Sequence, residues 1–427
     1  MKLSPKSMDA VSRPGERNWL DLAVLFFTSL AVRSAWLKFG AWMQYDSAEY
    51  MTLARNLAVH GAFSLGENGT PPTAFRPPLL PALIAALWRG EGEPVIATLI
   101  ANVILGSLTV CLTYLVARDR FDRRTALIAA GMLACGPMTC LFTVTVLTEP
   151  LFTFFVVLAI FLWGRGIFSL SGVAFGLGAL TRPSILPFLA GLPILSILPV
   201  FRRFWRSSLI LLGAALVVAS FWIIRNAVVF ERFIPVASSG WGTILLCGTL
   251  ETDTGGRVWN GEAWAPLNFT TNPITRVDGL TDESEIDRIR MTRAITRITE
   301  SPVEWLVVRA KQYPKLFIDN GDYLLGSANL PLREAFSAGR WTVIMTKLAF
   351  IGGNLFVMLL ALFGMWTLIP RLADHLHIIL FPVFGILIHL PVWIEPRYFL
   401  PMMPMIFILA AVGMQKFPIF NQFWSTD

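Results

Sequence analysis

The chain has 427 residues, of which 55% are hydrophobic and only 15% are charged, and this balance is too apolar for a soluble domain of its length. Its 32 Phe and 15 Trp residues suit a protein that places aromatic rings at both membrane interfaces. The net charge of +7 comes from short basic clusters between apolar runs. Such clusters indicate membrane topology, so we predict an integral membrane protein with no nucleic-acid partner.

About ten apolar segments approach the length of roughly 20 residues that a membrane-spanning helix needs. They lie at residues 19–37, 95–117, 125–144, 150–164, 166–181, 184–200, 207–225, 343–369, 374–393 and 398–415. The segment at 166–181 is the weakest candidate because it is short and rich in glycine. A polar, basic stretch precedes the first segment without a small-residue cleavage site, which predicts a signal anchor that stays in the mature protein.

Basic residues in the short connections predict the orientation of the chain, because Lys and Arg collect on the cytoplasmic side. They fall in every second connection and include Arg118, Arg120, Arg123, Arg124, Arg165, Arg202, Arg203, Arg206 and Arg371. Both termini are then cytoplasmic, and two long connections at 38–94 and 226–342 lie outside. We expect an N-terminal transmembrane module at 1–225, a periplasmic loop subdomain at 226–342 and C-terminal transmembrane helices at 343–427.

Shorter helices are predicted in both outer loops. In the first outer loop, residues 46–60 carry Met51, Leu53 and Leu57 at the spacing of one apolar helix face, and a second interfacial helix follows Arg76-Pro77-Pro78. In the second outer loop, a periodic apolar run at 281–313 predicts a small helical subdomain. The fold class that follows is an all-α polytopic membrane protein with small helical elements on its outer face.

Two acidic positions lie beside predicted outer helix ends. Asp46 follows the first spanning segment directly, and Glu49 comes one helical turn later, with Tyr50 and Arg55 close by. The alternative is that Asp46 is only an N-cap and Glu49 a solvated partner of Arg55. Glu149 is an isolated carboxylate between apolar stretches, and the cost of roughly 2.5 to 3.5 kcal/mol for a charge at mid-membrane favours a polar cavity around it. The alternative interpretation of Glu149 is an exposed turn residue before a helix that begins with proline.

Four arginines lie at the outer ends of predicted helices, namely Arg76, Arg182, Arg225 and Arg397. A guanidinium binds a phosphate through two parallel hydrogen bonds and stays charged at any working pH, so a cavity for an anionic lipid phosphate would need several. For each arginine alone the alternative is snorkelling to the membrane interface, and Glu395 would simply pair with Arg397. The four histidines are scattered, without metal-ligand spacing, so no metal or other cofactor is predicted.

Six short segments form a pattern in the order of the chain. They are residues 45–50 (YDSAEY) with 54–56, residues 76–81 (RPPLLP), 148–151 (TEPL), 178–183 (GALTRP), 225–226 with 233–236, and 396–401 (PRYFLP). This ordered set, at one predicted membrane face, resembles the GT-C superfamily of integral-membrane glycosyltransferases. The resemblance is to the bacterial relatives of protein O-mannosyltransferases and of the lipid A aminoarabinose transferase, and it spans nearly the whole chain.

The resemblance implies a GT-C fold, with residues 1–225 as the catalytic module. It implies transfer of a sugar from a polyprenyl-phosphate donor to an envelope acceptor, which would be lipid A or core oligosaccharide, a polysaccharide or a protein. Asp46 would be the general base of a single inverting displacement, and Glu149 would match the second acidic position. The expected binding residues are Glu49, Tyr50, Arg55, Arg76, Arg182, Arg225, Arg397 and Tyr398. The setting implied is a bacterial inner membrane, with the active site on its periplasmic or extracellular side.

One position departs from the aminoarabinose transferases, in which a glutamate and a lysine precede the loop proline. Phe75 and Arg76 stand at these places here. The basic group is kept, whereas the acidic group associated with metal binding is absent, so the resemblance does not lead us to predict a metal.

Two other functions stay open from the sequence. A transporter or flippase of polyprenyl-linked sugars would also need an anion-binding cavity and many helices, but the charges cluster outside, and the sequence has no internal repeat and no corresponding pair of broken helices. In a non-catalytic membrane scaffold, Asp46 and Glu149 would be dispensable.

Overall fold

In the computed structural model, which describes residues 18–417 apart from 40–44, 91, 239, 252–256, 260–263, 267–276, 278–279, 281 and 318–320, every predicted spanning segment is helical. The helices are α1 (Asn18–Trp36), α4 (Val95–Arg118), α5 (Arg123–Cys135) with α6 (Pro137–Leu141), α7 (Glu149–Gly164), α8 (Phe168–Thr181), α9 (Leu186–Leu195), α10 (Trp205–Phe230), α16 (Trp341–Leu368), α17 (Leu376–Ile388) and α18 (Met403–Lys416). The predicted signal anchor begins in residues outside this described part.

The lengths of these helices fall into two classes. In the described part of the chain, five helices are long and apolar enough to cross a membrane, or six if one bent pair counts as a single span. Four further apolar helices have 10–17 residues. Together they account for the ten predicted segments, so the chain is an all-α multi-pass membrane protein.

Shorter elements connect the spanning helices. They are α2 (Tyr45–His60), α3 (Leu79–Ala86), α11 (Trp241–Cys247), α12 (Glu283–Glu300), α13 (Pro302–Gln312), α14 (Asp322–Leu325), α15 (Leu332–Ser337) and the 3-10 helices η2 (Leu37–Phe39), η3 (Glu67–Gly69), η4 (Phe142–Val144), η5 (Pro183–Ile185), η6 (Pro199–Phe204), η7 (Tyr313–Leu316), η8 (Gly326–Ala328), η9 (Ile369–Asp374) and η10 (Pro396–Met402). Two short antiparallel strands, β1 (Arg257–Trp259) and β2 (Trp264–Pro266), pair Arg257 with Pro266.

These connecting elements agree with the predicted loop helices in type but not in every boundary. The helix predicted at 46–60 and the one after Pro78 correspond to α2 and α3. The periodic run at 281–313 forms two helices, α12 and α13, with Ser301 between them and Pro302 in the first turn of α13. The strands β1 and β2 are an exception to the predicted all-helical subdomain.

The third predicted span, 125–144, is broken rather than straight. Helix α5 ends at Cys135, and α6 with η4 continues at an angle of 55°. Gly136 has ψ 119° because a residue before proline is disfavoured in the helical region, and Pro137 has no N–H to donate. The break leaves backbone carbonyls without partners in their own helix.

Arg33 of α1 supplies the missing donors at this break. Its side chain is 2% exposed, and its guanidinium donates to the backbone oxygens of Leu133 at 3.0 Å and Thr139 at 2.6 Å. Its Nε donates to the hydroxyl of Ser29 at 3.0 Å. A buried cation is thus satisfied by the carbonyls that the helix break exposes, close to the helix C-terminus, where the dipole favours positive charge.

Replacing Arg33 with Met should therefore destabilise the fold. The substitution removes the Arg33 donor from the carbonyl of Thr139 and leaves the carbonyl of Leu133 only the hydroxyl of Thr139, and a buried acceptor without a donor costs about 1–3 kcal/mol. We expect a lower thermal unfolding midpoint in detergent for Arg33→Met. Arg206→Met, which removes an exposed arginine at the start of α10, is the control and should leave the midpoint unchanged. Equal midpoints for both variants would contradict this account of Arg33.

The glycine-rich helix α8 packs closely against α10. A Cβ atom on Gly172 would lie 2.5 Å from the backbone oxygen of Leu211, and one on Gly176 would lie 2.8 Å from that of Ala215. Both glycines are on one face, four residues apart, so the two helices approach through backbone contact, as small residues permit in membranes. The glycine content that makes this segment a weak hydropathy candidate is what allows it to pack.

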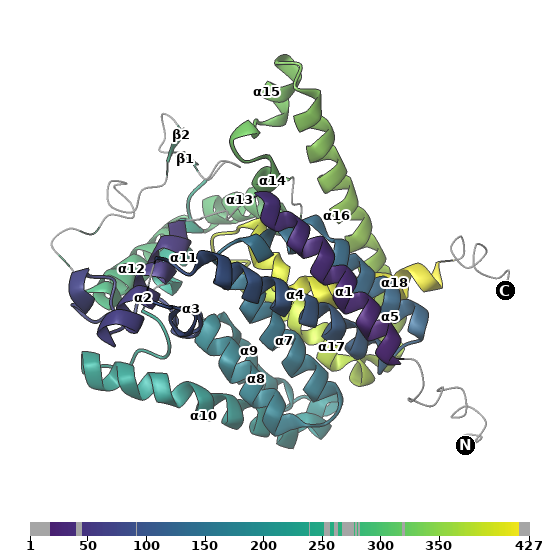
Figure 1. Cartoon of the computed structure of the whole chain (residues 1–427), viewed down its shortest axis with the longest axis horizontal. Helices are drawn as coiled ribbons and strands as arrows, with labels where there is room; N and C mark the ends of the chain where they lie inside the picture. Colours follow the sequence, from purple (N-terminus) through teal and green to yellow (C-terminus); the bar gives the residue numbers. More distant parts are fainter. Residues whose placement is uncertain are drawn as a thin grey trace.

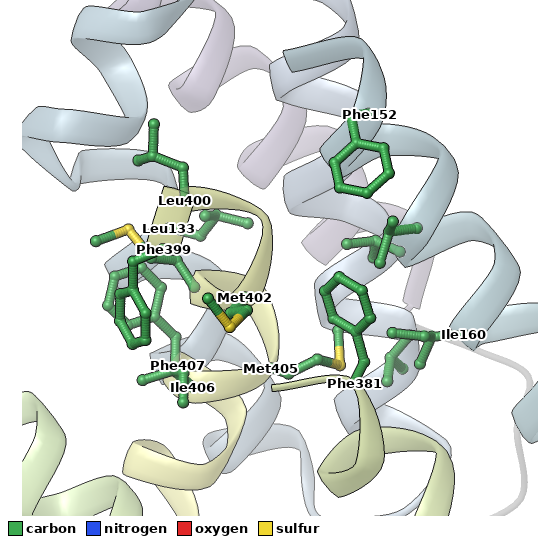
Figure 2. Packing of buried hydrophobic residues seen from close by; sticks show 14 of the residues in the cluster. Leu133, Phe152, Ile160, Phe381, Phe399, Leu400, Met402, Met405, Ile406 and Phe407 are labelled. Carbon is green, nitrogen blue, oxygen red and sulfur yellow. The ribbon is translucent and has the colours of Figure 1, made fainter. Parts of the chain in front are cut away.

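The hydrophobic core centres on α18 and η10. Every residue of α18 from Met403 to Gly413 is buried, and the helix packs against α4, α5, α16 and α17. Figure 2 shows Met402, Met405 and Phe407 of this region, with Phe152 and Ile160 of α7 and Phe381 of α17 nearby. A span this buried is shielded from lipid, and it holds the first turn of η10 in a fixed place.

Ion pairs gather the predicted inner connections at one end of the bundle. They join Asp21 to Arg123 at 2.6 Å, Asp119 to Arg165 at 2.8 Å and Arg203 to Asp374 at 3.3 Å. Helices α2, α3, α11 and α12 lie together away from the start of α1 and the end of α18 (Figure 1). We call the end of the bundle next to these four helices the cavity end. Which end faces the cytoplasm stays a prediction.

Candidate active site

A cavity of about 580 Å³ lies at the cavity end. Its walls come from residues 46–50, 75–77, 147–149, 181–184, 237–247 and 388–398, together with Arg290 of α12. Four carboxylates and four arginines line it, namely Asp46, Glu49, Glu149, Glu395, Arg76, Arg182, Arg290 and Arg397. Their formal charges balance, so the cavity concentrates charge without an excess of either sign.

Asp46 and Glu49 lie one turn apart at the start of α2 and share one arginine. The Nη2 atom of Arg76 is 2.6 Å from Oδ1 of Asp46, and its Nε donates to Oε2 of Glu49 at 2.6 Å. Burial alone would raise the pKa of Asp46, but Arg76 and Arg397 outweigh it and hold that pKa below the ordinary 3.8. Burial raises the pKa of Glu49, and Arg76 offsets this only in part. The two carboxyls therefore differ in proton affinity.

Glu149 occupies the first turn of α7, where the helix dipole favours a carboxylate. Its side chain is 3% exposed, and its Oε1 accepts a hydrogen bond from Nη1 of Arg182 at 3.0 Å. The Arg182 guanidinium lies 5.4 Å from the ring centre of Tyr398 and 5.9 Å from that of Phe152. Within the described residues, Oε2 of Glu149 has no hydrogen-bond partner. A buried oxygen in this state can accept a hydrogen bond from a hydroxyl of a bound molecule.

Arg397 joins the two acidic positions. Its Nη1 is 3.1 Å from Oδ2 of Asp46, and its Nε is 2.5 Å from Oε2 of Glu395 and 3.9 Å from Oε1 of Glu149. Its side chain is 13% exposed, and its guanidinium lies 5.8 Å from the ring centre of Tyr398. One guanidinium thus connects carboxylates from three separate parts of the chain.

Prolines fix the backbone at several of these positions. Arg76, Glu149, Arg182 and Glu395 each stand immediately before a proline. The residue before a proline is pushed toward an extended conformation, and proline is favoured in the first turn of the next helix. Arg182 has φ −145° and ψ 110°, and Glu395 has φ −124° and ψ 144°. The extended residue and the helix that follows it direct these two side chains to the end of the bundle.

Most residues predicted for the site line the cavity. They are Asp46, Glu49, Tyr50, Arg76, Glu149, Arg182, Arg397 and Tyr398. The predicted alternative pairing of Glu49 with Arg55 is replaced by the Glu49 pair with Arg76, and the predicted pair of Glu395 with Arg397 is present.

Arg55 and Arg225 are not among the residues that line the cavity. Arg55 is exposed, because nine residues separate it from Asp46 and place it about half a turn away around α2. Arg225 donates to the backbone oxygen of Thr73 at 2.9 Å, and its guanidinium lies 4.8 Å from the ring centre of Trp222. Its position supports the first outer loop instead of reaching the cavity.

The cavity also contains residues that were not predicted for the site, namely Trp241, Thr243, Arg290, His389, Trp393 and Glu395. Arg290 of α12 donates to the hydroxyl of Thr243 at 3.2 Å. Only Glu395 had a signal in the sequence, through its nearness to Arg397. Among the residues that the structure describes, no group of three His, Cys, Asp or Glu is arranged to hold a metal ion.

Comparisons with known proteins give one family match and several similar solved structures. Residues 75–224 match the family model described as dolichyl-phosphate-mannose-protein mannosyltransferase. No curated protein sequence matches the chain. The oligosaccharyltransferase of Archaeoglobus fulgidus, solved in complex with Zn and sulfate, has a similar structure, with a TM-score of 0.54 and 14% identity over 94% of this chain. The match covers 49% of the archaeal chain, so the present chain spans about half the length of that protein.

Two further solved structures are similar at lower scores. Archaeal oligosaccharyltransferase AglB from Archaeoglobus fulgidus, in complex with an inhibitory peptide and a dolichol-phosphate, has a TM-score of 0.48 and 14% identity, covering 95% of this chain and 50% of its own. ArnT from Cupriavidus metallidurans, bound to undecaprenyl phosphate, has a TM-score of 0.47 and 14% identity, covering 94% of this chain and 61% of its own. The family match covers residues 75–224 only, and the similarity to the oligosaccharyltransferase of Archaeoglobus fulgidus shows that the two chains share a fold.

Proposed function

We propose that the chain transfers a sugar from a polyprenyl-phosphate donor to a hydroxyl group of an envelope acceptor. The observation that carries the proposal is the single cavity in which Asp46 and Glu149 meet Arg76, Arg182 and Arg397. The description of the matched family, which names a dolichyl-phosphate sugar as donor and a protein as acceptor, supports this class of reaction. The acceptor would be lipid A or core oligosaccharide, a polysaccharide or a protein.

The chemistry needs one base and one stabilised leaving group. The acceptor oxygen attacks the anomeric carbon of the sugar, and the bond from that carbon to the phosphate oxygen breaks with inversion. Asp46 takes the proton that the acceptor hydroxyl loses. The phosphate is already a good leaving group, so the reaction needs no protein nucleophile, and the binding of both substrates in one cavity supplies their alignment.

The arginines would stabilise the departing phosphate. Arg76 and Arg397 contact both oxygens of Asp46, and Arg182 contacts one oxygen of Glu149. The phosphate of the polyprenyl-phosphate sugar competes with these carboxylates for the same guanidinium groups. Donor binding therefore releases Asp46 from part of its ion pairing, which makes it a stronger base in the complex than in the free protein. Oε2 of Glu149 accepts a hydrogen bond from the sugar or the acceptor.

A test of the proposal is transfer by the purified chain in lipid nanodiscs. The assay offers radiolabelled polyprenyl-phosphate sugars together with separate lipid A, polysaccharide and protein fractions of the envelope. Transfer of label to one acceptor class supports the proposal. Movement of labelled lipid across a liposome membrane without a new glycosidic bond would instead identify a transporter. If neither transfer nor transport is observed, the function as a non-catalytic scaffold is supported. Mass spectrometry of envelope glycans from a deletion strain identifies the natural acceptor.

The pH dependence of transfer provides a second prediction. Asp46 has a lowered pKa in the free protein, so its carboxylate stays ionised well below neutral pH. The acid limb of the pH profile of kcat/KM reports the pKa of the base in the free enzyme. The acid limb of kcat reports its pKa in the substrate complex, in which the donor phosphate and Asp46 share the arginines. We expect the acid limb of kcat at a higher pH than the limb of kcat/KM. The Glu49→Gln variant, which removes the neighbouring carboxyl with a raised pKa, should keep this order. The reverse order would exclude donor-induced activation of Asp46.

The cellular setting belongs to the same proposal. We place the chain in a bacterial inner membrane, with its termini in the cytoplasm and the cavity on the periplasmic or extracellular side. Residues 226–342 form a loop subdomain between an N-terminal catalytic module at 1–225 and C-terminal helices at 343–427. Because α11 and α12 contribute Trp241, Thr243 and Arg290 to the cavity wall, this subdomain is suited to cover the entrance for the acceptor.

A further inference from the structure

Helix α13 carries an exposed apolar stripe. Val303 is 71% exposed, Leu306 57% and Val307 49%, and Ala310 is also exposed. These residues stand at positions i, i+3, i+4 and i+7, which is the spacing of one face of a helix. Exposed aliphatic side chains in a continuous row mark a surface that contacts something apolar.

The opposite face of α13 is fixed against the protein. Val308, Arg309 and Gln312 are 7%, 6% and 5% exposed. The guanidinium of Arg309 donates to the backbone oxygen of Val392, in the segment that leads to Arg397. The rotation of the helix about its own axis is therefore set by its buried contacts, and the stripe points away from the protein.

The helix lies at the level where the spanning helices end. Tyr313, which follows α13 directly, donates its hydroxyl to the backbone oxygen of Ile386 near the end of α17. The ring of Phe317 packs edge to face on that of Phe399 in η10, with 5.8 Å between centres. Both contacts are at the cavity end of spanning helices, and Figure 1 draws α13 at this end, near α11 and α14.

We propose that α13 is an in-plane membrane anchor whose stripe inserts into the leaflet at the cavity end. Eleven residues rise only about 16 Å, which is too short to cross the roughly 30 Å hydrocarbon core, so the helix would lie along the surface. Lipid is the occupant that fits, because Tyr313 and Phe317, which follow α13, contact α17 and η10 at the level where the spanning segments end. Glu304 and Lys311, both exposed, border the stripe on one side and suit the headgroup region.

The anchor has a consequence for the cavity. The same helix that contacts lipid through Leu306 holds the carbonyl of Val392 through Arg309, and the neighbouring N–H of Trp393 donates to the backbone oxygen of Ile244 at 2.9 Å. The bilayer surface thereby sets the height of one cavity wall. This proposal concerns the seating of the chain in the membrane and is independent of the reaction proposed above.

Site-directed spin labelling tests the anchor. The four native cysteines, one of them exposed, are first replaced by alanine. Single cysteines at Val303, Leu306 and Val307 then carry a nitroxide in nanodiscs, and Glu300 and Glu304 serve as control positions on exposed polar surface. We expect the stripe positions to relax faster with oxygen than with a water-soluble nickel complex, and the two controls to show the reverse.

Two outcomes would overturn the proposal. Nickel accessibility at the stripe equal to that at Glu304 would place α13 in water. Protection of the stripe from both reagents would indicate a protein contact, either with a second copy or with another partner. The labels replace exposed side chains only, and a label at Ala310 checks that protection follows the helical period.

Discussion

Replacing Asp46 with Asn is expected to lower the rate of sugar transfer by about 10²- to 10⁴-fold, the range that a general base contributes. The substitution keeps the size of the side chain and removes its ability to accept the proton. The fold should persist, because Arg76 keeps its ion pair with Glu49 and Arg397 keeps its pair with Glu395. The measurements are the rate of transfer and the affinity for polyprenyl phosphate in nanodiscs.

The two readouts separate the possible roles of Asp46. A general base predicts lost transfer with retained lipid binding, which is expected to become tighter because two arginines lose a competing carboxylate. Glu67→Gln, which neutralises an exposed carboxylate elsewhere in the first outer loop, is the matched control and should behave as the wild type. An unchanged rate of transfer in Asp46→Asn would contradict the assignment of Asp46 as the general base.

The Arg397→Gln variant is expected to lose both stability and transfer. Arg397 contacts Asp46, Glu395 and Glu149, so its removal leaves neighbouring carboxylates without their common cation. Breaking a fully buried ion pair in this way costs about 3–5 kcal/mol, and this partly exposed network is expected to cost less. The departing phosphate also loses a hydrogen-bond donor. One preorganised hydrogen-bond donor contributes about 10²- to 10³-fold to a rate.

A double variant separates these two effects. In Arg397→Gln with Glu395→Gln, the cation and its nearest carboxylate are both neutral, so much of the lost stability should return. The transfer rate and the affinity for polyprenyl phosphate should stay low, because the guanidinium is still missing. Thermal unfolding and lipid binding are measured on the same samples. Recovery of transfer together with stability would mean that Arg397 has only a structural role.

The sequence was most informative where physical constraints act along the chain itself. The length of apolar runs predicts every spanning helix, and the short basic connections predict which loops share one end of the bundle. A charged residue beside a proline at a helix start, as at Glu149 and Arg182, predicts a side chain at the bundle end. Most of the residues that were predicted for the site line the cavity.

The remaining features depend on direction and on contacts between distant segments. Arg55 and Arg225 were predicted for the site together with Arg182, but helical phase turns Arg55 outward, and Arg225 donates to the carbonyl of Thr73. Arg290 reaches the cavity only because α12 packs against α11, which no periodicity in the sequence indicates. The break at Gly136 has a local cause, yet the donor that satisfies it is more than 100 residues away, in α1.

The equal numbers of arginines and carboxylates in the cavity bear on how a reaction cycle ends. In the proposed transfer, a phosphate diester with one negative charge becomes a monoester, which carries between one and two at neutral pH because its second pKa is about 6. The arginines then hold the spent lipid carrier more tightly than the loaded one. Once Asp46 has passed its proton to water, Asp46 and Glu149 would displace the carrier as they return to Arg76, Arg397 and Arg182, so the carrier would leave by exchange of ion partners. Release of the spent carrier would then be a separate step that follows glycosidic bond formation.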